Sequence, residues 1–152
     1  NNCKASGVDG CIIVDLPYVE SEEFLKKLNE EGVDLIRLIS PTTTDERISK
    51  ILASSSGYLY YISLKGVTGS NLKVSEELEK RVSKIKKQTN LPVVVGFGIK
   101  DSETANKMSK CSDGVVVGSK LVDEISKHPS IEDNLLKQNL TSIIEDLKLG
   151  IS

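Results

Sequence analysis

Short apolar runs alternate with longer amphipathic segments along most of the chain. Runs that are apolar at consecutive positions and rich in Val, Ile and Leu are typical of parallel strands buried on both faces. The segments between them carry apolar residues three and four positions apart, as on one face of a helix. We expect strands at residues 10–15, 34–39, 58–63, 92–96 and 114–117, and helices at residues 21–31, 45–53, 76–87, 101–110, 119–126 and 131–149. This alternation predicts an α/β fold with a parallel sheet.

A short repeat marks the turns that lead from a helix into a strand. Residues 5–10 read ASGVDG, residues 30–35 read EEGVDL, and residues 111–114 give a looser copy, CSDG. The second copy follows a full helix, so we expect residues 1–6 to form the last turn of a helix that begins upstream. The repeats are uniform, whereas an open doubly wound sheet, the alternative for five parallel strands, needs a reversal of strand order.

Composition and charge exclude several classes of protein. The chain has 152 residues and a net charge of -2, and its lysines alternate with glutamates along the helical patterns instead of forming a basic stripe that would bind nucleic acid. Its apolar runs fall far short of the roughly 20 residues of a membrane-spanning helix. Cys3, Cys11 and Cys111 are odd in number and lack C-x-x-C spacing, which predicts reduced thiols in a cytoplasmic protein. His128 precedes a proline in a polar stretch, so we expect a solvated side chain and no metal site.

Three turns that contain glycine follow directly on three successive expected strands. They read GVTG at residues 66–69, GFG at 96–98 and GS at 118–119. Glycine lets backbone N–H groups approach an anion closely, and the helix that begins at Ser119 adds the positive end of its dipole. A single glycine is explained more simply as the end of a strand, but three in succession favour a phosphate site, as at one rim of a barrel enzyme. The predicted phosphate-binding residues are Gly69, Gly98, Gly118 and Ser119.

Several of these motifs together resemble the tryptophan synthase alpha chain family over essentially the whole sequence. The matching segments, in order, are DLP at 15–17, YYIS at 60–63, GVTG at 66–69, GFG at 96–98 and GS at 118–119. The pattern S-x-x-G-V-T-G together with the later G-F-G and G-S makes the resemblance specific. The family is a (β/α)8 TIM barrel, so the resemblance implies that residues 1–152 are the C-terminal portion of a single barrel domain. They would form about the last five βα units, with the N-terminal units absent.

The resemblance implies a lyase of tryptophan biosynthesis. Such a chain cleaves indole-3-glycerol phosphate to indole and glyceraldehyde 3-phosphate and works with a beta chain in an alpha2-beta2 complex. PLP belongs to the beta chain, and no cofactor is implied here. The family's catalytic Glu and Asp lie at the ends of the first strands, and neither can be assigned in this sequence. Glu20, Glu22 and Glu23 occupy a helix start, where acidic residues favour the helix dipole without a catalytic role. Residues 1–152 alone are therefore expected to be inactive.

The same resemblance implies roles for two residues near the substrate. Tyr60 would position the substrate at the barrel mouth, although a buried core aromatic with a satisfied hydroxyl fits the sequence equally well. Thr68 lies in the segment 64–73, which in the family closes over the substrate. Tyr61 should face the opposite side of the strand and pack beneath a helix.

Two further loops follow expected strands. The resemblance places Asp15 and Pro17 at the contact with the beta chain, while a turn or capping role for Asp15 is an equal alternative. The hydroxyl-rich residues 40–44 could line the pocket or cap the next helix, and capping is favoured.

Two other functions stay open. One is a non-catalytic module that binds phosphate and the beta chain. The other is a phosphate-binding TIM-barrel isomerase or epimerase, because such enzymes share the barrel and its phosphate turns. The G-V-T-G segment favours the tryptophan synthase family over the isomerases.

Overall fold

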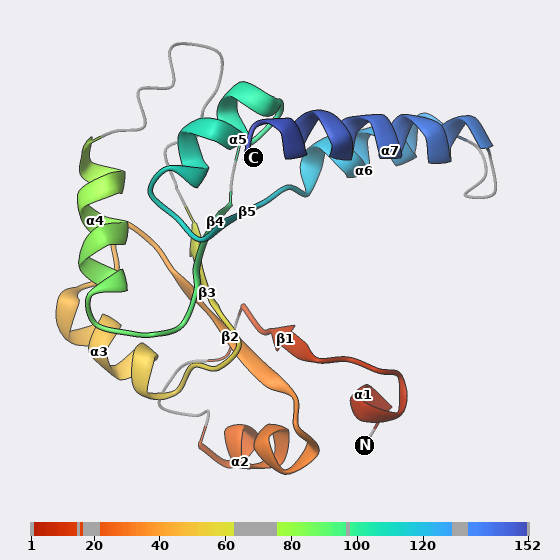
Figure 1. Cartoon of the computed structure of the whole chain (residues 1–152). Helices are drawn as coiled ribbons and strands as arrows, with labels where there is room; N and C mark the ends of the chain where they lie inside the picture. Colours follow the sequence, from red (N-terminus) through yellow and green to blue (C-terminus); the bar gives the residue numbers. More distant parts are fainter. Residues whose placement is uncertain are drawn as a thin grey trace.

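The strands of the computed structural model form a parallel sheet that curves as a half-barrel (Figure 1). The structure describes residues 2–14, 16, 22–62, 76–96, 98–128 and 134–151. Within these ranges the sheet has five strands in the order β1-β2-β3-β4-β5. They are β1 (Gly10–Ile12), β2 (Asp34–Ile39), β3 (Leu59–Ile62), β4 (Val93–Gly96) and β5 (Gly114–Val116). Because spatial order follows chain order, the sheet lacks the reversal that a doubly wound fold requires.

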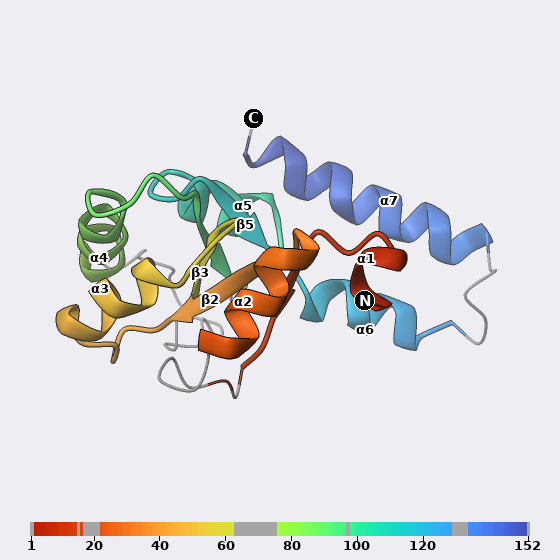
Figure 2. The same cartoon turned by 90° about the horizontal axis from the view of Figure 1, so that it is seen from below.

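Helices cover one face of this sheet and extend beyond its last strand. They are α1 (Asn2–Ala5), α2 (Glu22–Glu31), α3 (Asp45–Ala53), α4 (Glu76–Lys86), α5 (Ser102–Ser109), α6 (Ser119–Ser126) and α7 (Asn134–Leu149). α2 to α5 lie along the convex side, and α7 packs against both α5 and α6 (Figure 2). The predicted helices are confirmed within one or two residues wherever the chain is described. Strand β1 ends at Ile12, earlier than expected, because its ladder with β2 stops at the pair Ile12–Ile36.

The core lies between the convex face of the sheet and the helices. Leu59, Tyr61, Val93 and Val95 point to this side, and each is at most 2% exposed. They pack with apolar residues of α3, α4 and α5 in one cluster. The prediction that Tyr61 lies beneath a helix is therefore confirmed. Side chains alternate along a strand, so Tyr60 and Val94 point to the concave side, where they are only half-buried.

The repeated sequence forms the same helix ending twice. Gly7 and Gly32 both have positive φ, +71° and +66°, which favours glycine. After each of them a valine N–H donates to a carbonyl five residues back, Val8 to Cys3 at 3.0 Å and Val33 to Leu28 at 2.9 Å. This is the Schellman pattern that terminates helices. The interpretation of the repeat as a helix-to-strand turn is confirmed at Gly7 and Gly32, and α1 is a single helical turn before the first of them.

Side chains from the third copy of the repeat and from the turn before β3 fasten the starts of neighbouring strands. Asp113 accepts the N–H of Val93 through Oδ2 at 2.9 Å, while its Oδ1 lies 2.6 Å from Lys86 Nζ. Ser56 Oγ accepts the N–H of Leu35 at 3.0 Å. These contacts lie at the amino ends of the strands, the stabilising face of a barrel.

His128 is not solvated, so that expectation was wrong. Its side chain is 9% exposed, and its Nε2 lies 3.4 Å from Glu124 Oε1 at the end of α6. Glu124 also accepts a hydrogen bond from Asn139 Nδ2 of α7 at 2.7 Å. The residues around His128 are polar, and a local pattern cannot show that α7, which comes later in the chain, packs against α6 beside them.

Glu124 gives this junction a defined pH dependence. Hydrogen bonds from Lys127 and then Asn139 lower the pKa of the Glu124 carboxyl from 4.5 to about 2. A carboxyl with a depressed pKa in the folded state stabilises the fold above its unfolded pKa and loses that effect as the pH falls. The excess stability of the unaltered protein over Glu124→Gln should therefore be largest at neutral pH and vanish between about pH 4.5 and pH 2. Chemical denaturation across that range measures it.

The control is Glu145→Gln, which alters an exposed carboxylate of α7. Its stability difference from the unaltered protein should stay small at every pH. A Glu124→Gln difference that does not change with pH would contradict the prediction.

Candidate functional site

The ends of β4 and β5 place two of the predicted glycine turns at one edge of the sheet. The strands pair in parallel with Gly96 opposite Val116. Gly98 and Gly118 each follow that pair by two residues. The two turns therefore leave the sheet at its carboxyl edge, side by side, which is where parallel α/β folds bind ligands.

Gly98 adopts a backbone conformation that favours glycine. Its φ is +73°, in the left-handed region that other residues rarely enter. The chain after it is held firmly, because Ile99 is 5% exposed and Asp101 forms a capping box with Thr104 at the start of α5. These contacts hold the residues that follow Gly98 in place, so the backbone at Gly98 is fixed from that side.

Gly118 is the N-cap of α6, and at this position there is space for a larger side chain. A Cβ built on it would meet nothing within 4 Å, and no side chain caps the helix. The first N–H groups of the helix, including that of the exposed Ser119, lack an intrahelical acceptor. An open helix start of this kind is suited to an anion.

Tyr60 reaches from β3 across the concave face to Gly96 of β4. A Cβ on Gly96 would lie 2.1 Å from Tyr60 Oη and 2.5 Å from its Cζ, so the phenol ring occupies that space. Burial raises the pKa of Tyr60, with a smaller contribution from Tyr58, and the hydroxyl stays protonated at neutral pH. The sequence predicted a site role for Tyr60 but not this contact. The glycine that closes the run Val93–Gly96 was the available signal.

The hydroxyl-rich residues after β2 form a cap, as favoured from the sequence. Thr44 is the N-cap of α3 and accepts the N–H of Arg47 at 3.4 Å. Thr43 Oγ1 accepts the N–H of Ser40 at 3.1 Å, and the Thr43 carbonyl accepts from Arg81 of α4. These residues hold the loop in place and need no ligand to explain them.

Four predicted site residues lie outside the residues that the structure describes: Asp15, Pro17, Thr68 and Gly69. Leu16, between the first two, is described, and its carbonyl accepts a hydrogen bond from Arg37 Nη1 at 3.1 Å. Arg37 is a buried arginine of β2 that the sequence analysis missed. An arginine between the apolar residues of a strand was the signal that could have identified it.

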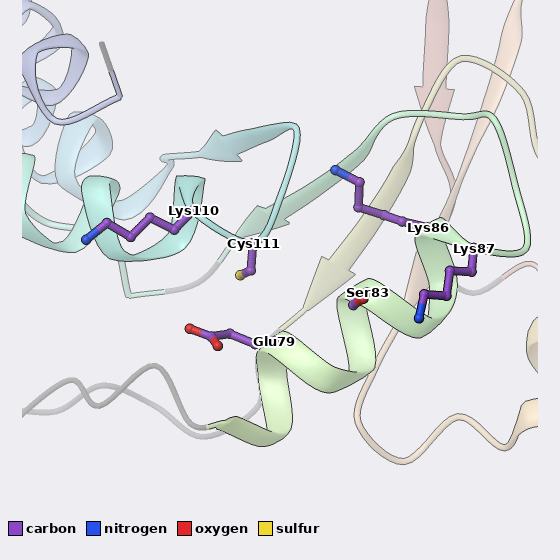
Figure 3. Close-up of a pocket in the computed structure, with 6 residues that line it drawn as sticks. All are labelled: Glu79, Ser83, Lys86, Lys87, Lys110 and Cys111. Carbon is purple, nitrogen blue, oxygen red and sulfur yellow. The ribbon is translucent and has the colours of Figure 1, made fainter.

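A groove of about 570 Å³ lies elsewhere, between α4 and α5 on the outer side of the molecule (Figure 3). Glu79, Lys86 and Cys111 are among its lining residues. Lys86 is paired with Asp113, and burial raises the pKa of the Cys111 thiol, which makes it less reactive. Lys86 and Lys110 stand where α4 and α5 end and lead into β4 and β5, so the groove lies toward the amino ends of these strands and takes no part in the candidate site at their carboxyl ends.

The described residues offer neither a metal-binding cluster nor a membrane-spanning helix. Within the described ranges, no three His, Cys, Asp or Glu side chains are grouped so that they could hold a metal ion. All three cysteines are free thiols. Of the helices described, none has the length and apolar character needed to cross a membrane.

Comparison with known proteins gives a consistent family. The family model for the tryptophan synthase alpha chain matches residues 1–150. The tryptophan synthase alpha chain of Marinobacter nauticus is 46% identical over 143 residues, which cover 94% of this chain and 53% of that protein. The crystal structure of tryptophan synthase subunit alpha from Legionella pneumophila superposes with a TM-score of 0.81 at 36% identity, covering 97% of this chain and 53% of that one.

A crystal structure of the tryptophan synthase complex from Pyrococcus furiosus is also similar, with a TM-score of 0.77 and 31% identity over 96% of this chain and 56% of that chain. The chain thus spans about half the length of the curated relatives it matches. The five parallel strands correspond to part of the TIM barrel of these proteins. On the strength of the family match over 150 residues, the chain belongs to the tryptophan synthase alpha chain family.

Proposed function

We propose that the complete protein is the alpha subunit of tryptophan synthase, a lyase that cleaves indole-3-glycerol phosphate to indole and glyceraldehyde 3-phosphate. The observation that carries the proposal is the pair of turns at Gly98 and Gly118, which lie at the carboxyl edge of adjacent strands. One has a left-handed glycine and the other an open helix start. Both are features by which a backbone binds phosphate.

In this proposal Gly69, Gly98, Gly118 and Ser119 bind the phosphate of the substrate. Tyr60 and Thr68 position the rest of it. Tyr60 supports this role by its neutral hydroxyl on the concave face, beside the strand that leads to Gly98. The aldol cleavage also needs an acid and a base, and none of the described carboxylates is assigned to either role. Glu22 and Glu23 lie in the first turn of α2 and are explained by the helix dipole.

The proposed partner is a tryptophan synthase beta chain, which would carry the PLP and receive the indole. The relative from Pyrococcus furiosus was solved as a tryptophan synthase complex, which supports an assembly of this kind. Asp15 and Pro17, after β1, are the residues proposed for the contact. No cofactor is proposed for this chain.

The first experiment measures indole release from indole-3-glycerol phosphate by the complete protein, with and without a beta chain. Indole formation that the beta chain accelerates supports the proposal. If no indole forms under either condition, the lyase assignment is wrong. The polypeptide of residues 1–152 alone should give no turnover, because a general acid or base typically contributes about 10²–10⁴-fold each.

A charge placed at Gly118 tests the phosphate site separately from stability. Gly118→Asp should leave α6 as stable as before or slightly more stable, because Asp is a preferred N-cap and the space is open. Its carboxylate would repel the phosphate, so binding of glycerol 3-phosphate, measured by calorimetry, should weaken at least about tenfold.

Gly118→Asn is the matched control, since it offers a similar cap of similar size without the charge. It should bind clearly more tightly than Gly118→Asp. Equal affinities for the two variants, or no binding of glycerol 3-phosphate by the unaltered protein, would exclude a phosphate site at this turn.

A second candidate is a non-catalytic module that binds phosphate and the beta chain. One observation favours it. In the ranges described, the turns at the carboxyl edge of the sheet contain glycines, and the carboxylate of Asp101, which follows the Gly98 turn, is already used to cap α5 and so is not assigned as an acid or a base. Binding of glycerol 3-phosphate and of a beta chain by calorimetry, together with no indole release from the complete protein, would favour this module over the lyase.

A further inference from the structure

The helix that begins at the Gly118 turn has a small contact with the rest of the described protein. None of the residues of α6 is buried. Its partly buried residues are Leu121 and Glu124, which are three positions apart and so lie on one face of the helix. Val122 and Ile125 are 62% and 41% exposed. Within the described ranges, α6 therefore rests on a face that combines one leucine with one carboxylate.

Glu124 meets a polar residue on the inner face of α7. This face is a stripe of residues three or four positions apart, namely Leu136, Asn139, Ile143 and Leu147. Leu136 and Leu147 are 1% and 7% exposed, so Asn139 is an amide in an otherwise apolar stripe. Its Nδ2 donates to Glu124 Oε1 at 2.7 Å. The amide thus connects the inner faces of the two helices.

Two further groups contact Glu124, and both come from the end of α6 itself. Lys127 Nζ lies 2.8 Å from Glu124 Oε2, and His128 Nε2 lies 3.4 Å from its Oε1. In the part of the chain that the structure describes, the bond from Asn139 is therefore the one that joins this carboxylate to another helix. Hydrogen bonds to ionised groups are among the stronger ones in proteins, so this bond helps to fix where α6 lies beside α7 (Figure 2).

α7 is in turn fixed to the element behind the other phosphate turn. α5 begins at Ser102, four residues after Gly98, and the Ser102 N–H donates to Asp146 Oδ2 of α7 at 3.3 Å. Leu147 packs in the main core beside this contact. α7 packs against both α5 and α6 (Figure 1). It therefore connects the helix that follows the Gly98 turn with the helix that follows Gly118.

We propose that Asn139 is a positioning residue for the phosphate site. By holding Glu124, it sets where the start of α6 lies relative to the Gly98 turn. The placement matters because the attraction between an anion and a helix start is confined to the first turn. The inference rests on the proposed function, which assigns Gly98, Gly118 and Ser119 to the phosphate. Asn139 acts through α6 and does not itself touch the substrate.

The test introduces Asn139→Asp into the complete protein. The new side chain has nearly the same size, but it replaces the donor with a carboxylate that faces Glu124, and the two like charges repel. The dissociation constant for glycerol 3-phosphate, measured by calorimetry at a temperature where both proteins are folded, should rise about tenfold, the size of one hydrogen bond to a charged group. A purely structural residue would lower the midpoint of thermal unfolding and leave this affinity unchanged.

A second substitution should reverse the effect. In the double variant Glu124→Gln with Asn139→Asp, the amide and the carboxylate have exchanged places, so the hydrogen bond can form in the opposite direction at the same net charge. The affinity for glycerol 3-phosphate should return to near that of the unaltered protein. A double variant that binds no more tightly than Asn139→Asp alone would show that the bond between α6 and α7 does not position the site.

Two single variants control for charge. Gln138→Asp places the same charge at the neighbouring exposed position of α7 and should leave the affinity unchanged. Asn139→Leu removes the donor without adding a charge, so its affinity should fall between those of Asn139→Asp and the unaltered protein. This comparison also remains available if Asn139→Asp does not fold.

Affinities of Asn139→Asp and Asn139→Leu equal to that of the unaltered protein would overturn the inference, and so would an equal loss in Gln138→Asp. If the unaltered complete protein does not bind glycerol 3-phosphate, the proposed phosphate site falls, and the positioning role falls with it. Measuring the unaltered protein first distinguishes the two failures.

Discussion

Gly96→Ala is expected to lower the free energy of unfolding by about 2 kcal/mol, as is typical when a packed site is overfilled. The new methyl group would lie 2.1 Å from Tyr60 Oη and 2.4 Å from Tyr60 Cε2, both far inside van der Waals contact. The ring must leave its position on the concave face, and that position is the one proposed to face the substrate. Urea denaturation measures the loss of stability, and indole release by the complete protein measures the loss of activity.

A double-mutant cycle identifies the tyrosine as the cause. In a Tyr60→Ala background the space over Gly96 is empty, so Gly96→Ala should cost much less there than in the unaltered protein. Gly114→Ala is the control in the neighbouring strand, where a Cβ would lie 3.4 Å from Val94 Cγ1, an ordinary contact. If Gly96→Ala costs the same in both backgrounds, the contact with Tyr60 does not determine the residue at position 96.

The positions of the strands and helices of this fold could be predicted because each depends on local sequence. Consecutive apolar residues mark β3 and β4, and apolar spacing marks α3 and α4. The repeat EEGVDL predicted the helix ending at Gly32, since a left-handed glycine followed by an apolar residue is a common way for a helix to end. The edge at which Gly98 and Gly118 meet follows from the parallel connection alone.

The parts that could not be predicted depend on contacts between distant segments. The burial of His128 arises because α7 returns over α6 and brings Asn139 to Glu124. Arg37 donates a hydrogen bond to a carbonyl 21 residues away, and neither local sequence indicates that the two residues are in contact. Tyr60 could be placed on the concave face by alternation, but its contact with Gly96 required the register between two strands. In each case the missing information is which side chains of separate elements share one space.

Gly150→Ala is expected to be the most destabilising of these glycine substitutions, at about 3 kcal/mol, because the atoms it meets belong to the backbone. A Cβ on Gly150 would lie 2.1 Å from the carbonyl oxygen of Ser102 and 2.8 Å from its carbonyl carbon, at the start of α5. A side chain could turn aside, but Ser102 is fixed by the helix that it begins. The end of α7 must therefore move away from α5.

That movement would break the contacts that join the two helices. Asn106 Nδ2 donates to the Gly150 carbonyl at 2.8 Å, and the Ser102 N–H donates to Asp146 Oδ2 at 3.3 Å. Leu147, 7% exposed, packs in the main core one turn earlier. Amide hydrogen exchange should therefore become faster in α7 and in the first turn of α5, while β3 and β4 keep their protection.

Two other substitutions provide a scale for the loss of stability in Gly150→Ala. Asn106→Ala removes one hydrogen bond without a collision and should cost about 1 kcal/mol. Leu149→Ala alters a neighbour that is 76% exposed and should change stability by less than about 0.5 kcal/mol. Urea denaturation of the three variants should therefore give the order Gly150→Ala, Asn106→Ala, Leu149→Ala. If Gly150→Ala is as stable as Leu149→Ala, the end of α7 is not fixed against α5, and the hydrogen bonds between them contribute little to the fold.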